Sequence, residues 1–116
     1  MHEYSLAHAL VERVEREARA RGASAVHHVT VRIGPLSGVE PALLVTAFRH
    51  LRPGTLCADA ELDLAGDDVV WRCEVCGVVL APGSVLGCPE CGLPARLAGG
   101  DALVLERIEL EVPAHV

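Results

Sequence analysis

The 116-residue chain contains no lysine, and only 3% of its residues are aromatic. Ten basic residues stand against 16 acidic ones, which gives a formal net charge of −6. Binding to nucleic-acid phosphates depends on clustered lysine and arginine, so this balance argues against a nucleic-acid partner. The 51% hydrophobic content is enough for a core. With so few aromatic residues, alanine, valine and leucine must build that core.

Long apolar runs are also missing. No stretch approaches the roughly 20 residues that cross a membrane, and the first residues lead directly into a charged, helix-like segment. We therefore expect no signal peptide and no membrane association. The expected compartment is the reducing cytoplasm, where paired cysteines hold a metal more often than they form disulfides.

Four of the five cysteines form two Cys-x-x-Cys pairs, and a glycine follows each pair, at Gly77 and Gly92. Such a segment folds into a tight knuckle whose two thiolates face one point, because glycine allows the left-handed backbone angle of the turn. Two knuckles arrange four sulfurs tetrahedrally, which is the geometry of structural Zn(II). The predicted zinc ligands are Cys73, Cys76, Cys88 and Cys91. Disulfide pairing is the alternative, and the expected compartment disfavours it. We expect the remaining Cys57 to be a small, half-buried apolar residue.

Two helices are predicted from apolar residues that recur at helical spacing. The first spans about residues 4–21 and ends at Gly22. The second begins near Pro41, a residue suited to a first helical turn, and stops at residues 52–54.

Alternating apolar and polar residues predict strands at about residues 26–33, 60–64 and 103–112, and a shorter strand leads into the first knuckle at residues 69–72. The last strand alternates strongly, so one of its faces should be buried. The sheet that it can join is the one made by the first two strands.

The predicted fold class is therefore α+β: a small sheet covered by two helices on one face, with an inserted zinc-ribbon-like lobe. We expect residues 1–67 and 101–116 to form one discontinuous domain and residues 68–100 to form the cysteine lobe. A lobe of this size buries too little apolar surface to fold alone. Structural zinc, which is worth about 10–16 kcal/mol in small peptides, would supply the missing stability.

A histidine at position 2 is a second candidate metal site. The imidazole of His2, its own amide nitrogen, the Met1 amine and the amide nitrogen of Glu3 can surround one cation in a plane. This arrangement suits Ni(II) or Cu(II) and not tetrahedral Zn(II). By itself the signal is weak, because a histidine at this position is usually an exposed residue without a role.

Several segments together resemble the HypA/HybF family, the nickel metallochaperones of nickel–iron hydrogenase maturation. They are the opening Met-His-Glu-Tyr-Ser, the segment Val-Arg-Ile-Gly-Pro-Leu-Ser-Gly-Val at residues 31–39, the two cysteine pairs and the closing strand. The similarity covers nearly the whole chain in order.

The resemblance implies a protein with two metal sites and no catalytic activity. His2 would be the nickel ligand, assisted by the Met1 amine and the main-chain nitrogen of Glu3, and the four paired cysteines match the zinc ligands. The implied partners are a HypB-type GTPase and the hydrogenase large subunit, with urease as a further recipient for some members. The role of the Glu3 side chain stays open. Glu40 could approach the nickel or a partner, although a helix N-terminal acid stabilised by the dipole is the favoured interpretation.

Some relatives carry a histidine beside a Cys-x-x-Cys pair, whereas glycine follows both pairs here. The nearest histidines, His50 and His115, are distant in the sequence, so we predict a plain four-thiolate site. We expect none of the other histidines to be a metal ligand; these are His8, His27, His28, His50 and His115.

Three other classes of protein share part of this pattern. A nucleic-acid-binding zinc ribbon should be basic and aromatic around its cysteines, but acidic residues outnumber Arg72 and Arg96 there. A rubredoxin-like electron carrier would hold iron and be red. An enzyme is disfavoured because four thiolates leave zinc no open position for water, and no nucleophile–base set is recognisable.

Overall fold

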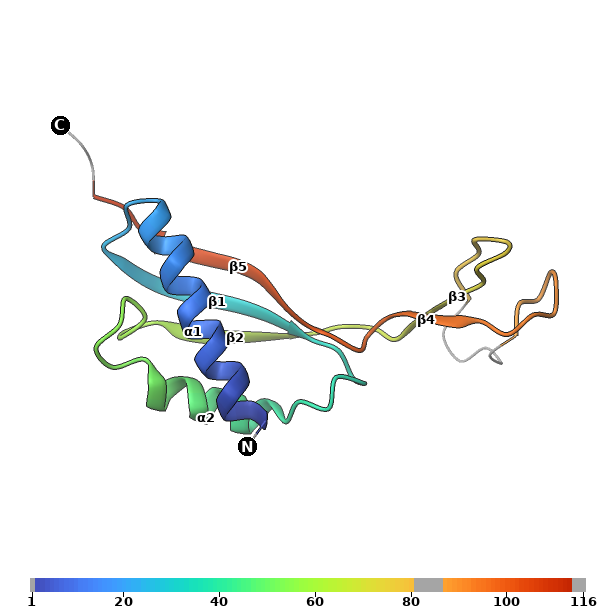
Figure 1. Ribbon diagram of the computed structural model, residues 1–116, viewed down its shortest axis with the longest axis horizontal. Coiled ribbons are helices and arrows are strands. Elements are labelled where there is room, and N and C mark those ends of the chain that lie inside the picture. The colour runs from blue at the N-terminus through green and yellow to red at the C-terminus, as the bar shows by residue number, and fades with distance from the viewer. Residues whose placement is uncertain (1, 81–86, 114–116) are drawn as a thin grey trace.

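The computed structural model describes residues 2–80 and 87–113 and is elongated, with extents of 60 × 37 × 17 Å. In Figure 1 the helices and a three-stranded sheet form one end of the molecule, and the part of the chain with the two Cys-x-x-Cys pairs forms the other. The elements are α1 (His2–Ala20), β1 (Ala25–Ile33), α2 (Pro41–Leu51), β2 (Glu61–Gly66), β3 (Val70–Arg72), β4 (Arg96–Gly99) and β5 (Leu103–Glu111). None of the helices within the described residues has the length and apolar character needed to cross a membrane.

The larger sheet has the strand order β2-β1-β5. β1 pairs in parallel with β2 and antiparallel with β5. The parallel pair is connected through α2, because two parallel strands need a crossover and cannot be joined by a tight turn. The prediction that the last strand joins the sheet of the first two is confirmed.

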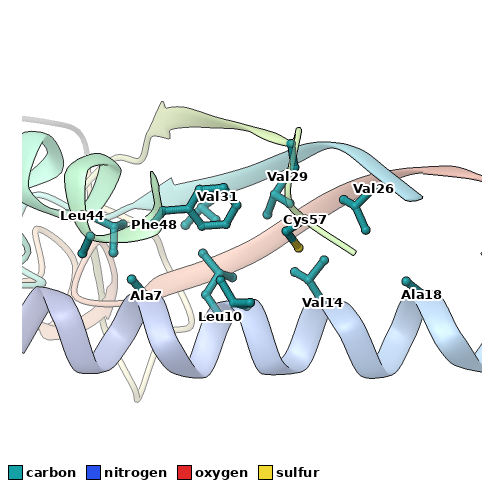
Figure 2. Packing of buried hydrophobic residues seen from close by; sticks show 13 residues of the cluster. Ala7, Leu10, Val14, Ala18, Val26, Val29, Val31, Leu44, Phe48 and Cys57 are labelled. Carbon is teal, nitrogen blue, oxygen red and sulfur yellow. The ribbon is translucent and has the colours of Figure 1, made fainter. Parts of the chain in front are cut away.

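Both helices lie on one face of this sheet, and the core fills the space between them and β1 (Figure 2). The side chains in this core are small or aliphatic, with a single aromatic ring among them. Figure 2 labels Ala7, Leu10, Val14, Ala18, Val26, Val29, Val31, Leu44, Phe48 and Cys57. The Cys57 side chain is fully buried and not half-buried as predicted. The reason is that Cys57 lies in the turn between α2 and β2, which packs against α1: the neighbouring Leu56 amide donates to the Glu15 carboxylate over 3.2 Å.

Several boundaries differ from the sequence predictions by one or two residues, and β4 was not predicted. α1 begins at His2, two residues before its predicted start. Glu3 lies in the first turn, where its negative charge is stabilised by the helix dipole. At the other end of the chain, β5 stops at Glu111, which pairs with Ala25 at the start of β1. Val112 has no partner residue on β1 to pair with and is 50% exposed.

The cysteine lobe, residues 68–100, is inserted between β2 and β5. Its strands β3 and β4 form a separate two-stranded antiparallel sheet. The chain enters and leaves the lobe through a narrow neck, residues 67–69 and 100–102. At the neck, the Gly34 amide donates to the Ala102 carbonyl over 3.0 Å and the Leu36 amide donates to the Gly100 carbonyl over 2.8 Å. The loop after β1 is thereby fastened to the base of the lobe.

Candidate metal centres

Both Cys-x-x-Cys pairs form the predicted knuckles. In the first, the Gly77 amide donates to the Cys73 carbonyl over 2.8 Å, and in the second, the Gly92 amide donates to the Cys88 carbonyl over the same distance. The two glycines have φ angles of 70° and 73°, in the left-handed region that side chains other than glycine disfavour. The turn chemistry therefore sets the direction of both thiol pairs locally.

The two knuckles bring all four sulfurs together at the end of the lobe. The Sγ atoms of Cys73, Cys76, Cys88 and Cys91 all lie within 4.8 Å of one another. The Cys73 and Cys91 sulfurs are 3.5 Å apart. Ligands at a Zn–S distance of about 2.3 Å in a tetrahedron are about 3.8 Å apart. The four-cysteine arrangement therefore fits a tetrahedral, thiolate-ligated cation.

The pKa values of the clustered thiols differ, and the difference shows why the cluster suits a cation. Amide hydrogen bonds from Cys91 and Glu90 lower the pKa of the Cys88 thiol to about 7. Hydrogen bonds to the sulfurs of Cys91 and Cys88 raise the pKa of Cys76 to about 12. The Cys88 thiol thus ionises readily, while the Cys76 thiol keeps the proton that it shares with the neighbouring sulfurs. A divalent cation bound by the four sulfurs would replace these protons.

The second candidate centre lies at the start of α1. The His2 side chain is 58% exposed, and its Nδ1 atom is 3.6 Å from a carboxylate oxygen of Glu3. The first amide groups of a helix have no carbonyl acceptor within the helix. The Glu3 main-chain amide therefore has no acceptor within the helix and contacts its own carboxylate instead. Met1, the source of the predicted amine ligand, lies outside the described residues.

The Glu3 side chain makes a contact that sequence reasoning did not find. Its carboxylate accepts a hydrogen bond from the Glu40 amide over 3.1 Å, and this bond holds the pKa of Glu3 below its ordinary value of 4.5. The Glu3 carboxylate thus joins the first turn of α1 to the residue before α2. No local pattern indicated the contact, because 37 positions separate the two residues.

Glu40 is the N-cap residue of α2, with an extended backbone and no capping hydrogen bond from its side chain. This position agrees with the favoured interpretation of a helix N-terminal acid. Among the described residues its carboxylate has no ion-pair partner, and it is the amide of Glu40, not the carboxylate, that contacts Glu3.

The remaining histidines lie apart from the four sulfurs. His8, His27 and His50 are exposed, and His28 is half-buried with its ring 2.8 Å from the Asp63 carboxylate. Within residues 2–80 and 87–113, the four cysteines are the only cluster of three or more potential metal ligands. His115 lies outside the described residues.

A helix-covered sheet that carries a separate, thiol-lined lobe defines a small metal-binding protein of the α+β class. Comparison with known proteins identifies it further. Residues 1–110 match the family model described as HypA, "Hydrogenase/urease nickel incorporation, metallochaperone, hypA". The chain belongs to the HypA family, which confirms the resemblance found in the sequence.

Relatives and solved structures agree with this assignment. The chain is 38% identical to the hydrogenase maturation factor HypA of Shewanella sp. (strain MR-7), over 96% of both chains. It is also 38% identical to that of Aquifex aeolicus, over 97% of this chain and 99% of the relative. The solution structure of the nickel metallochaperone HypA from Helicobacter pylori matches with a TM-score of 0.76 at 29% identity, over 96% of this chain and 98% of that one. Another HypA solution structure matches with a TM-score of 0.85 at 29% identity, over 97% and 98% of the two chains.

Proposed function

We propose that this protein binds Ni(II) at its N-terminus and delivers it during the maturation of a nickel–iron hydrogenase. Family membership supports nickel incorporation as the general role. The observation that carries the specific proposal is the exposed His2 imidazole at the first turn of α1, beside amide groups that the helix leaves unpaired.

Nickel would be held by the His2 side chain, the Met1 amine and the main-chain nitrogen of Glu3. An amide nitrogen must lose its proton before it binds a metal, so loading is favoured by higher pH and reversed by acid or by a competing ligand. The site is exposed and exchangeable, which suits a cargo that must be both captured and released. Copper would bind such a nitrogen set more tightly, so selection for nickel depends on the metal supply and on docking to the correct partner.

The four cysteines would hold a resident Zn(II) ion that has a structural role. Saturation by four thiolates leaves this ion no position for a substrate, so we do not assign the protein a catalytic activity. We also propose that residues 1–67 with 101–116 form the nickel-binding domain and residues 68–100 the zinc-binding lobe. The separate sheets β2-β1-β5 and β3-β4 support this division.

The proposed partners are a HypB-type GTPase and the hydrogenase large subunit, and the proposed compartment is the cytoplasm. The matched family description names urease as well as hydrogenase, so urease is the second recipient that we propose. The proposal includes no nucleic-acid or membrane partner, in keeping with the acidic composition.

Calorimetric titration of Ni(II) into the untagged native protein, His2→Ala and His8→Ala tests the nickel site. The histidines at positions 2 and 8 lie on the same helix with equally exposed side chains, 58% each, which makes His8→Ala a matched control. We expect His2→Ala to lose the tight binding event and His8→Ala to retain it, with zinc content unchanged in all three proteins. Equal nickel affinities for native protein and His2→Ala would refute the proposal.

A further inference from the structure

An apolar recess opens at the ends of the parallel strands β1 and β2. Its volume is about 330 Å³, and side chains of Ile33, Pro35, Val39, Pro41, Leu64 and Ala65 line it. Leu36 follows the lining residue Pro35 directly in the sequence, and its apolar side chain is 54% exposed. Within residues 2–80 and 87–113, no further element covers these apolar side chains.

The lining of the recess contains no charged or polar side chain among the described residues. Sites for small molecules start at about 300 Å³ and normally include a few convergent polar groups that fix the orientation of the ligand. The recess has the minimum size but lacks those groups. Its chemistry suits an aliphatic side chain that a partner protein inserts, because such a side chain needs shape and apolar contact but no hydrogen bonds.

The surroundings of the recess are acidic. Glu40 lies between two lining residues in the sequence, and the Asp67 amide donates to the Ile33 carbonyl over 3.2 Å. Asp101 is held near Leu36 by the hydrogen bonds that its two neighbours accept from the loop after β1. Asp67 pairs with Arg32 at 3.8 Å, whereas Glu40 and Asp101 have no ion-pair partner among the described residues. A partner with arginine or lysine beside its apolar anchor would complement this rim.

The recess also lies near the proposed nickel site at the start of α1. Its lining residue Pro41 follows Glu40 directly, the Glu40 amide contacts the Glu3 carboxylate, and that carboxylate is 3.6 Å from the His2 ring. Figure 1 shows the N-terminus of α1 beside the start of α2 and the loop that leads from β1. A protein seated in the recess would have its surface next to the exposed imidazole.

We propose that this recess and its acidic rim form the docking surface for the protein that exchanges nickel with His2, and that this protein inserts an aliphatic side chain flanked by basic residues. The inference rests on the proposed nickel function. It adds a division of roles: the N-terminus holds the metal, whereas the recess selects the protein that receives or supplies it.

Binding of purified HypB-type GTPase and of purified hydrogenase large subunit, each titrated separately, tests the surface. The test variants are Leu36→Arg at the edge of the recess and Asp101→Lys on its rim. Matched controls are Val112→Arg, because Val112 is 50% exposed just beyond β5, and Asp59→Lys, because Asp59 is an exposed acid before β2. All four are surface changes, and circular dichroism verifies that each variant is folded.

We expect both test variants to weaken binding of at least one partner about tenfold or more, which corresponds to about 1.4 kcal/mol. The controls should bind like the native protein. Unchanged binding of both partners by the test variants, or no binding of either partner by native protein, would overturn the inference. Nickel titration of the same variants separates the two proposals. Leu36→Arg and Asp101→Lys should keep the native nickel affinity, whereas His2→Ala should lose nickel binding but keep the recess intact.

Discussion

The Glu3 carboxylate has a structural role that can be measured separately from nickel binding. Its pKa lies below 4.5 because it accepts a hydrogen bond from the Glu40 amide. A carboxyl group whose pKa is lowered by folding contributes stability above its unfolded pKa, and this contribution disappears as the pH falls through the lower, folded pKa. We expect the Glu40 amide resonance to titrate with a midpoint below 4.5. In Glu3→Gln the amide oxygen still accepts the bond, so this inflection should vanish, and a midpoint at or above 4.5 in native protein would contradict the assignment.

Cys57 is expected to be chemically inert, in contrast to an exposed thiol. Burial, followed by the negative charge of Glu15, raises the pKa of the Cys57 thiol from 9.0 to about 11. Two units correspond to about a hundredfold smaller thiolate fraction near neutral pH, and the thiolate is the reactive form. Iodoacetamide at pH 8 should leave Cys57 of the folded, zinc-loaded protein unmodified and should label it in urea. Peptide mass spectrometry measures this, with Cys57→Ala as the control that identifies the peptide; rapid labelling of folded protein would disprove the burial.

The loop between β1 and α2 depends on a close approach of two backbones. A Cβ atom at Gly34 would lie 2.2 Å from the Gly100 carbonyl oxygen, a contact that the backbone must move to relieve. We expect Gly34→Ala to lower the free energy of unfolding by about 1–3 kcal/mol, the usual cost of forcing extra volume into a packed site. Gly66→Ala is the matched control, since a Cβ atom there meets nothing within 4 Å. Urea denaturation followed by circular dichroism compares them, and equal stability would show that the neck is loose.

Local patterns predicted both helices and every strand except β4, because periodicity is a property of neighbouring residues. The 3.6-residue repeat predicted the bounds of α2 within a residue or two. The two-residue alternation predicted the start of β5 and missed its end by one residue, because β5 stops where its partner β1 begins. Alternation carries no information about strand direction, so the parallel pairing of β1 with β2 emerged only from the structure. The same holds for the Gly34–Gly100 approach, which joins segments far apart in the chain.

The two metal sites differ in what the sequence could predict. Each knuckle is a local structure with its own glycine, so the clustering of four thiols was predictable and is confirmed. The nickel ligands at the N-terminus remain a prediction from chemistry and family resemblance. The surroundings of His2 are formed by tertiary contacts. Glu40 and the recess come close to α1 only because the chain folds back through β1. Sequence patterns could identify the ligands but not the surface beside them.

The buried apolar core of the molecule is distributed unevenly between its two ends. The core of the helix–sheet end contains Phe48, Leu44 and the buried valines, whereas the buried apolar side chains described in the lobe are Cys73, Leu80 and Cys88. Two of these three are predicted metal ligands. The lobe therefore has almost no apolar core that is independent of its metal, and its folding should depend on the cation.

Chelation should consequently unfold one end of the protein and spare the other. The only tryptophan, Trp71, lies in β3 of the lobe, whereas both helices lie at the opposite end. We expect removal of the metal by a strong chelator, or the substitution Cys73→Ser, to expose Trp71 and shift its fluorescence to longer wavelength. Helical circular dichroism should change little, because α1, α2 and the β2-β1-β5 sheet keep their shared core. Loss of both signals together would mean that the cation stabilises the entire chain, and retention of both would mean that the lobe folds without it.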